Sequence, residues 1–599
     1  MTSPRIVPQS STRKRRLNFA NNLPIFVDCM ADARYIQVIL PLRLEWEPYY
    51  RLPEGLDVQV GDRVRALFAG AFYVAVVSAV GVAPTLDPAR IMPLEGVEKD
   101  LPPITKEEIA FWRILAQYYL CEVGEVYKAA YPLMKHHKSR LALPEQQAPV
   151  DKLVLIPEEK QGADAAGQAE KTVLLKGNDS INIYLKLALD TYRSGRSVLL
   201  LVPEIAFSGQ LAEQVQAVFP SALFYHSKVT PGKKKQVAQM LRSGEPYVVL
   251  GTRSALFLPH QKLGLVIVDE EHDSSYKQDA PAPRYHTREA AIMLAGIHGA
   301  RVILGSATPS LDSIYNAQIG RFERIELKNS LKQNAPVEIE IVDIGAEYRK
   351  RGMAGSFSLK LLERIQQTLQ AGEQVLLVTP RRTSIGGRKM EEEVLEFCPS
   401  ARIAILDGTA EDQAETIRSF AAGEFDILLG NSFLSRGFES PRLNMVAILA
   451  ADGILSRQDF RADERALQVL EQFKDRCRHF VIQTREPKHP LFVSLSGGED
   501  ITQRMLEERR VAGYPPFTRM VKLLLRDPNE KRLQYMSREL CKELAPLGVP
   551  VEGSQYEIRI LLPRDKALTG RKEAIGQTVD AFEKKNKYMH HIVIDVDPV

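Results

Sequence analysis

The feature that most constrains the fold of this chain is a set of apolar runs, four to six residues long, each ending in glycine, proline, an acidic residue or a hydroxyl residue. Such runs are typical of parallel strands that are buried on both faces of a sheet and alternate with helices. They fall into two series, namely TVLLKG, SVLLLVPE, YVVLGT, LGLVIVDEEH and ARVILGSATPS, and then QVLLVTPRR, ARIAILDG, FDILLGN and NMVAILAAD. The sequence therefore predicts a multidomain α/β protein with two doubly wound domains, over 171–335 and 336–485, and with ligands at the carboxyl ends of the strands.

Segments outside these two domains predict further parts of the chain. Residues 1–34 carry the basic run Arg13–Arg16, which predicts a disordered tail that is also suited to contact phosphates. Period-two alternation with glycines at the breaks predicts a small β domain over 35–102. The remaining predictions are a helical segment over 103–140, a polar linker or exposed helix over 141–170, and a smaller α+β domain over 486–599.

The composition excludes several classes of protein. The 599 residues include 79 lysines and arginines against 75 aspartates and glutamates, and the resulting net charge of +4 permits a nucleic-acid partner without demanding one. No run of about 18 apolar residues is present, so we expect neither a membrane span nor a membrane partner. No two of the five cysteines lie closer than 64 positions, which excludes zinc knuckles and a disulfide framework and fits a cytoplasmic protein.

The strongest sign of chemistry is an acidic cluster that directly follows an apolar strand. Residues Leu263 to Val268 deliver Asp269, Glu270, Glu271 and His272 at the carboxyl end of that strand. An acid in this position can hold hydrated Mg²⁺ beside a nucleotide, and the next acid can orient an attacking water. The alternative is a surface turn, but an acidic cluster seldom forms one directly after a buried strand. The cluster therefore predicts a nucleotide site.

Further motifs accompany this cluster in a fixed order, namely LLLVPE, GTRSALF, GSATPS and GNSFLSRGF. In this order and spacing they resemble the motif series of superfamily 2 helicases. Longer stretches, among them GTRSALFLP, DEEHDSSYKQDAPAPRYHTREAA, DFRADERALQ and AGYPPF, resemble the PriA family of replication restart helicases. The resemblance runs from about Tyr35 to the C-terminus.

The resemblance implies a fold and a set of partners. It implies an N-terminal β domain that holds the 3′ end of a nascent strand, and then a winged helix, which is cut short in this chain. Two RecA-like helicase lobes and a C-terminal DNA-binding domain follow. The implied partners are forked or single-stranded DNA, replication-restart proteins and single-strand-binding protein, and the family's cofactors are ATP and Mg²⁺. The family's aspartate that contacts a terminal nucleotide is Tyr49 here, so we do not expect selective binding of 3′ ends.

Three functional parts of the family's helicase are missing from the sequence. A P-loop needs glycines that let backbone amides cradle phosphates, a lysine, and a hydroxyl for Mg²⁺, but LLKGNDSINIYL keeps only Gly177. The segment that carries the family's arginine for the γ-phosphate reads QFKDRCRH, which keeps Gln472 and Arg476 but ends in His479. The paired zinc cysteines are replaced by TSIGG. We therefore expect a vestigial nucleotide site and a vestigial Walker B motif, Asp269 and Glu270, with no bound cofactor and no zinc.

Residues suited to nucleic acid are better retained. Thr252 and Arg253 follow a strand end, where a hydroxyl and a guanidinium can bind phosphate oxygens. The segment DSSYKQDAPAPRYHTR mixes aromatic and basic side chains, which suits stacking on a base while holding its backbone; the alternative is that these rings pack under the loop. The residues predicted to contact DNA are Gln210, Thr252, Arg253, Tyr276, Lys277, Arg284, Tyr285, Arg288, Arg381, Arg382 and Arg436.

Three functions follow from these patterns. The preferred one is a DNA-binding replication-restart protein that recognises forked or single-stranded DNA without ATP-driven unwinding. The second is an active ATP-dependent 3′→5′ helicase, and the third is an interaction scaffold that has also lost DNA binding. ATP turnover in the presence of forked DNA separates the second from the others, and the salt dependence of DNA binding separates the first from the third.

Overall fold

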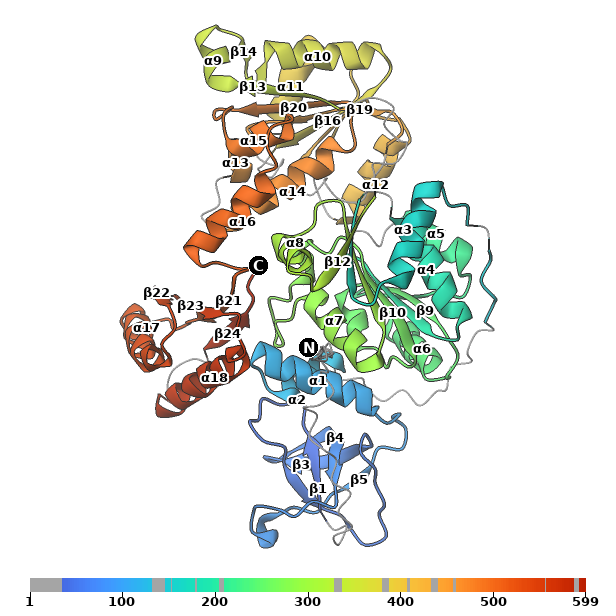
Figure 1. The fold of residues 1–599 in the computed structure, drawn as a ribbon, viewed down its shortest axis with the longest axis vertical. Helices are drawn as coiled ribbons and strands as arrows, with labels where there is room; N and C mark the ends of the chain where they lie inside the picture. Colours follow the sequence, from blue (N-terminus) through green and yellow to red (C-terminus); the bar gives the residue numbers. More distant parts are fainter. Residues whose placement is uncertain are drawn as a thin grey trace, which may run out of the picture.

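The structure, a computed structural model, describes residues 35–131, 146–151, 153–177, 180–203, 210–327, 337–379, 387–406, 410–431, 440–455, 459–554, 556–586 and 592–599. The basic run Arg13–Arg16 lies outside these residues. The described residues form five sheets, and Figure 1 shows them as an elongated array with the second α/β domain at the top and the N-terminal sheet at the bottom. Within the described ranges, no helix is both long and apolar enough to cross a bilayer.

The N-terminal part is an antiparallel five-stranded sheet in the order β2-β1-β4-β3-β5, followed by two helices. The first helix begins at Thr105, whose side chain accepts from the amide of Glu108 while the Glu108 carboxylate accepts from the amide of Thr105, as the sequence pattern predicts. The elements are β1 (Tyr35–Ile39), β2 (Tyr49–Arg51), β3 (Arg63–Phe68), β4 (Ala71–Val80), β5 (Gly96–Val97), α1 (Lys106–Tyr119) and α2 (Val123–Ala130).

Helix α1 joins three parts of the molecule. Its residue Tyr119 is buried and accepts a hydrogen bond from the backbone amide of His286 in the first α/β domain. The neighbouring Tyr118 donates to Asp597 near the C-terminus, and its carbonyl accepts from Lys572. Helix α1 is therefore a packing centre between the N-terminal sheet, the first α/β domain and the C-terminal domain (Figure 1).

The first α/β domain, which we call lobe 1, is an all-parallel sheet in the order β12-β6-β11-β10-β7-β9-β8. Alternate residues face opposite sides, so Val266 and Val268 pack in one core while Leu265 and Ile267 pack in the other. The elements are β6 (Thr172–Lys176), α4 (Ile181–Arg193), β7 (Ser197–Leu201), α5 (Gln210–Val218), β8 (Leu223–Tyr225), α6 (Pro231–Leu241), β9 (Val248–Gly251), β10 (Leu263–Val268), α7 (Thr287–His298), β11 (Arg301–Ser306), α8 (Leu311–Gln318) and β12 (Phe322–Glu326).

The second α/β domain, lobe 2, is a parallel sheet in the order β13-β20-β19-β16-β18-β17. With lobe 1 it confirms the predicted fold of two helicase lobes. The elements are β13 (Glu338–Asp343), α9 (Ile344–Arg349), β14 (Met353–Ala354), β15 (Phe357–Ser358), α10 (Leu359–Gln370), β16 (Gln374–Thr379), α11 (Gly387–Phe397), β17 (Ile403–Ile405), α12 (Ala410–Ala421), β18 (Ile427–Asn431), β19 (Leu443–Ile448), α13 (Asp452–Leu455), α14 (Ala462–Lys474) and β20 (His479–Thr484).

The segment predicted as a linker or exposed helix contains a largely exposed helix, α3, which packs one face on lobe 1. Helix α3 (Pro157–Gln168) buries Ala163 and Ala166 in the core that it shares with α4, and Glu159 accepts from Asn182. Earlier in this segment, the amide of Val150 donates to the carbonyl of Val218. The high alanine and glutamate content suggested exposure, but the small alanine side chains allow a close approach of α3 to α4.

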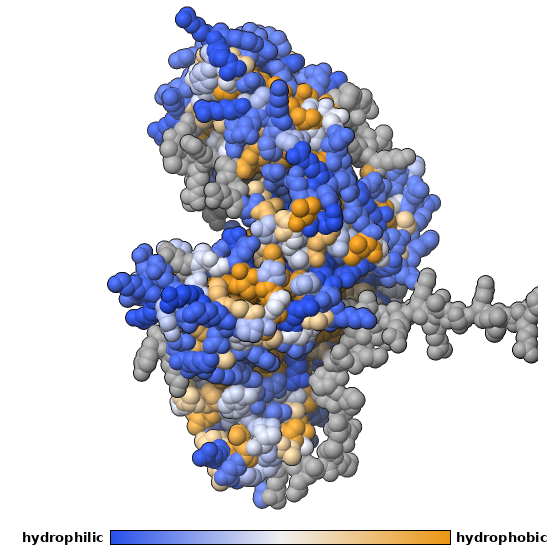
Figure 2. All heavy atoms as spheres, turned by 60° about the vertical axis from the view of Figure 1, so that its left-hand side comes forward, coloured by the Kyte–Doolittle hydropathy of each residue, from blue (hydrophilic) through white to orange (hydrophobic). Residues whose placement is uncertain are grey.

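The C-terminal part begins with two helices that lead away from lobe 2 and ends in an antiparallel sheet in the order β22-β23-β21-β24. Figure 2 turns this part forward and shows a largely hydrophilic face with apolar side chains gathered near its middle. The elements are α15 (Pro490–Leu495), α16 (Ile501–Ala512), β21 (Thr518–Leu524), α17 (Glu530–Leu544), β22 (Val551–Gly553), β23 (Glu557–Pro563), α18 (Leu568–Lys585) and β24 (Val593–Val596).

Candidate nucleotide site and nucleic-acid interface

The acidic cluster lies where the sequence predicts it, at the carboxyl end of β10. Strands β6, β11 and β10 are neighbours in the parallel sheet, so their ends bring Gly177, Gly305 and Asp269 to one edge. Helix α4 follows β6 and begins at this edge, so the backbone amides of its N-terminus lie where such helices commonly bind an anion. The arrangement is that of a nucleotide site in a doubly wound sheet.

A tyrosine that the sequence reasoning missed reaches into this site. Tyr184, in the first turns of α4, is buried and donates its hydroxyl to Oδ1 of Asp269 at 3.0 Å. The same hydroxyl lies over Gly305, because a Cβ atom built on Gly305 would come within 1.6 Å of Tyr184 Oη. Helical side chains lean toward the N-terminus of their helix, so the ring covers the first turn of α4. The hydroxyl therefore lies between the ends of β10 and β11.

Asp269 is held from two sides. Burial raises the pKa of Asp269 to about 6, and the hydrogen bond from Tyr184 acts in the opposite direction by stabilising the carboxylate. The backbone carbonyl of Asp269 accepts from the hydroxyl of Tyr276 at 2.6 Å. The acid is therefore part of a packed network of side chains rather than a free ligand.

The residues at this edge do not fit ATP and Mg²⁺. Residues 177–180 alone join β6 to α4, which is too few to wrap a phosphate as a P-loop does. The amide of Gly177 donates to the carbonyl of Ser306, and a Cβ atom at Gly177 would approach Leu327 Cβ to 2.7 Å. Together with the bond that Tyr184 makes to Asp269, these contacts occupy groups that would otherwise face phosphate and metal.

The third acid of the cluster, Glu271, is fully buried and structural. It accepts from the amide of Ser310, from the hydroxyl of Ser313 and from Nη1 of Arg288 at 2.8 Å. Arg288 also pairs with Glu289. The prediction that Arg288 contacts DNA is wrong, because its buried guanidinium pairs with the carboxylates of Glu271 and Glu289.

His272 links the acidic cluster to lobe 2. Its Nδ1 lies 2.7 Å from the hydroxyl of Ser306, and its Nε2 lies 3.0 Å from Nε2 of Gln472 on α14. Gln472 therefore meets the site, as the vestigial-site prediction requires. Arg476 lies just beyond the end of α14 and is half-buried.

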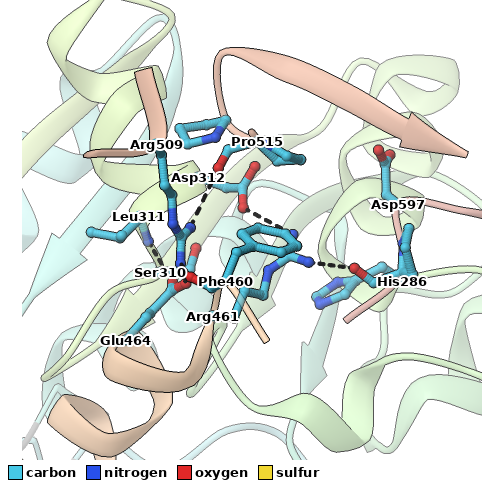
Figure 3. Close-up of polar contacts among 12 residues, drawn as sticks. His286, Ser310, Leu311, Asp312, Phe460, Arg461, Glu464, Arg509, Pro515 and Asp597 are labelled. Atoms are coloured by element: carbon cyan, nitrogen blue, oxygen red, sulfur yellow. Dashed lines mark hydrogen bonds and ion pairs between the residues drawn. The ribbon is translucent and has the colours of Figure 1, made fainter. Parts of the chain in front are cut away.

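A second contact between the lobes lies beside the first and also includes α16. Glu464 of α14 accepts from the amide of Leu311, the first residue of α8, at 2.8 Å and pairs with Arg509 of α16 at 2.7 Å. Arg461 pairs with Asp312 and donates to the carbonyl of Pro598. Figure 3 shows these side chains pointing toward one another from four segments of the chain. The patterns DFRADERALQ and GSATPSLDS thus form an interface between the lobes.

The aromatic and basic segment after the acidic cluster does not form a stacking surface. Tyr276 and Tyr285 are each 1% exposed, and Lys277 is 5% exposed. Lys277 pairs with Asp595 and donates to the carbonyls of Arg284 and Val596. The prediction that these three side chains contact DNA is wrong, and the alternative of rings packed under the loop is correct. Arg284 is half-buried and its pKa is lowered by burial.

The predicted phosphate contacts on lobe 1 are only partly available. Thr252 is buried, and Nη1 of Arg253 donates to the carbonyls of Ser275 and Lys277. Gln210 is the first residue of α5. The remaining predicted contacts, Arg381, Arg382 and Arg436, lie outside the described residues.

A basic loop that the sequence reasoning missed lies next to Thr252. The amide of Thr252 donates to the carbonyl of Tyr225, so the ends of β8 and β9 are adjacent. The loop between β8 and α6 carries exposed Lys228, and the first turn of α6 carries exposed Lys233. The run of lysines in the pattern HSKVTPGKKK is the sequence signal that could have revealed this loop.

Comparisons with known families agree with this arrangement. Residues 37–132 match the family described as 3'DNA-binding domain (3'BD), with the family label PriA_3primeBD. Residues 181–317 match the DEAD/DEAH box helicase family, and residues 359–481 match the helicase conserved C-terminal domain. The three matches fall on the N-terminal part, lobe 1 and lobe 2.

Whole-chain comparisons find curated relatives of similar length. The replication restart protein PriA of Rickettsia felis is 27% identical over 622 residues, which cover 89% of this chain and 95% of the relative. The replication restart protein PriA of Treponema pallidum is 28% identical over 581 residues, which cover 82% and 87%. A solved structure of RecG bound to a three-way DNA junction is 16% identical and covers 67% of this chain and 51% of its own, with a TM-score of 0.41 that is too low to argue from.

Proposed function

This chain belongs to the PriA family of replication restart proteins, and from that membership we propose that it binds forked or single-stranded DNA without using ATP to unwind it. The observation that carries the proposal is an N-terminal part that matches the 3'DNA-binding domain family, together with a lobe 1 edge where Asp269 bonds to Tyr184 and the residues do not fit a nucleotide. The protein would act in the cytoplasm, at sites where replication restarts, and would recruit replication-restart proteins and single-strand-binding protein.

Two features support DNA binding. The five-stranded sheet and α1–α2 cover the residues that match the 3'DNA-binding domain family. The exposed lysines Lys228 and Lys233 lie at the carboxyl edge of the lobe 1 sheet, where their charges can contact phosphate oxygens. Because Tyr49 stands where the family has an aspartate, we propose that binding is not selective for 3′ ends.

DNA binding is tested by fluorescence anisotropy with a labelled fork at about 50 and 200 mM salt, because phosphate contacts give a steep salt slope. We expect Lys228→Gln/Lys233→Gln to weaken binding and to lower the slope by about 1 to 2. The matched control is Lys350→Gln/Lys389→Gln, which removes the same charge from exposed lysines on lobe 2. An affinity that stays flat with salt would instead favour the interaction scaffold.

One observation favours the active helicase as a second candidate. Asp269, Glu270 and Arg476 are present, and His272 meets Gln472 across the lobes, as a nucleotide-driven cycle would need. Single-turnover ATP hydrolysis with forked DNA decides between the two. Turnover that Glu270→Gln abolishes would refute the proposal, and turnover at the level of buffer would support it.

A further inference from the structure

We infer that residues 595–598, which we call the brace segment, fix helix α1, lobe 1 and lobe 2 in one orientation, so that DNA contacts on separate parts of the chain act together on a fork. The inference goes beyond the proposed function, and only its DNA readout rests on that function. The brace segment is a positioning element and not itself a binding site.

Each residue of the brace segment contacts another part of the molecule. The contacts join Asp595 and the carbonyl of Val596 to Lys277 of lobe 1, each at 2.7 Å, Asp597 to the hydroxyl of Tyr118 on α1 at 2.7 Å, and the carbonyl of Pro598 to Arg461 of lobe 2. Arg461 also pairs with Asp312 of lobe 1 at 3.6 Å (Figure 3). Four consecutive residues thus contact three parts of the chain that are far apart in the sequence. A change in the orientation of any one part breaks contacts of this segment.

The brace segment is itself fixed to the C-terminal sheet. Val596 at the end of β24 pairs with Val521 of β21, and the amide of Asp597 donates to the carbonyl of Met520 at 2.9 Å. The carboxylate of Asp597 also pairs with Arg519 of β21 at 3.2 Å. Asp597 has a φ of +51°, a left-handed conformation that is unfavourable for a residue with a side chain and persists where surrounding contacts determine it. This turn brings the residue that follows it to lobe 2.

The charged contacts of the brace segment are shielded from water. The side chains of both pairs, Lys277 with Asp595 and Arg519 with Asp597, are largely buried. Removing one partner of a buried pair leaves the other charge uncompensated, which costs more than the loss of an exposed pair. The brace segment therefore holds these parts more firmly than surface pairs would, whereas domains of one chain otherwise tend to move relative to one another.

The brace segment lies between two parts for which DNA contacts are proposed. On one side, the backbone carbonyl of Lys277 accepts from Arg253, at the edge of lobe 1 that carries Lys228 and Lys233. On the other side, Tyr118 belongs to the residues that match the 3'DNA-binding domain family. Two linked binding parts raise the affinity for a ligand that reaches both by about 10²–10⁴-fold, provided that their geometry allows simultaneous contact.

The first test compares a fork, which can reach several parts of the chain, with a single strand of about six nucleotides, which covers about one binding part. Fluorescence anisotropy of the full chain should show that Asp597→Asn weakens fork binding by about tenfold and leaves single-strand binding unchanged. Tyr118→Phe, which removes only a hydroxyl, should act in the same direction with a smaller effect. The matched control is Asp565→Asn, which breaks a pair with Arg571 inside the C-terminal domain and should bind both ligands like the unmodified chain.

The second test uses amide hydrogen exchange without DNA. In Asp597→Asn we expect exchange over residues 106–119 of α1 to be faster by about tenfold, because a hydrogen bond to a charged group is lost, and we expect no change in Asp565→Asn. Equal exchange in these two variants would overturn the inference, and so would fork and single-strand affinities that fall by the same factor. If the unmodified chain bound neither ligand, the proposed function would be refuted, and exchange alone would decide on the brace segment.

Discussion

The contact between the lobes makes the sharpest prediction about stability. Glu464 and Arg509 are 6% and 4% exposed, and their side chains pair at 2.7 Å. Glu464 also accepts from the amide of Leu311, which has no partner within its own helix because it is the first helical residue. Glu464→Gln keeps an oxygen for Leu311 but removes the carboxylate that bonds the buried guanidinium of Arg509. Breaking a buried pair in this way costs about 3–5 kcal/mol.

The expected loss in the free energy of unfolding lies at the lower end of that range, because Arg509 keeps another hydrogen-bond acceptor in the variant. Arg509 still donates to the carbonyl of Phe460, so we expect a loss of about 3 kcal/mol. In a domain of about 150–250 residues, each kcal/mol lowers the melting temperature by about 2–4 °C, so the calorimetric transition of the lobes should fall by about 6–12 °C. The matched control is Glu507→Gln, which breaks the exposed pair with Arg510 on the same helix and should hardly move the transition. Equal shifts in the two variants would refute the reasoning.

Three further predictions concern lobe 1. Burial raises the pKa of Asp269 from 3.8 to about 6, so this group stabilises the fold at low pH, and that stabilisation is lost as the pH rises from about 4 through 6. The loss is about 3 kcal/mol. Calorimetry across this pH range should show the loss in the unmodified chain but not in Asp269→Asn. Burial lowers the pKa of His260 to about 3, so the stabilisation from this neutral group is complete above about pH 6.5 and falls by about 3 kcal/mol toward pH 4.5. Unfolding free energies of His260→Gln measured down to pH 4.5 should lack this loss. The same fall in stability in both chains would contradict the prediction. Gly305→Ala should lower the free energy of unfolding by about 1–3 kcal/mol, because the added methyl group overpacks against Tyr184, and by less in a Tyr184→Ala background. If the effects of the two substitutions on the free energy of unfolding simply add, the two residues are not in contact.

The sheets could be predicted from sequence because parallel strands leave a strong local signal. Runs such as LGLVIVDEEH are buried on both faces, so apolar composition and a polar end mark both the strand and its carboxyl edge. The attachment of α3 could not be predicted in this way. Its buried residues Ala163 and Ala166 are too small to give a helical apolar stripe, and their partners lie on α4.

The DNA-contact predictions failed where charge and aromaticity were taken as signs of exposure. Lys277 is buried because Asp595, far away in sequence, returns to pair with it. Arg288 is buried because Glu271 and Glu289 compensate its charge. The pairing of Lys277 with Asp595 is non-local, so composition within one segment does not reveal it. The partners of Arg288 lie within the same stretch of sequence, but only the fold shows that they bury its guanidinium. Lys228, in contrast, lies in the lysine-rich pattern HSKVTPGKKK and is exposed in the structure.

The acidic motif is therefore weak evidence for hydrolysis in this chain. Catalysis needs Asp269 to face a metal and a phosphate, whereas here its carboxylate accepts from Tyr184 and its carbonyl accepts from Tyr276. Glu271 stabilises the start of α8 through the amide of Ser310. The carboxylate contacts of Asp269 and Glu271 would be lost if these acids were replaced, whether or not ATP ever binds. The motif DEEH thus has a structural reason to be present in this chain.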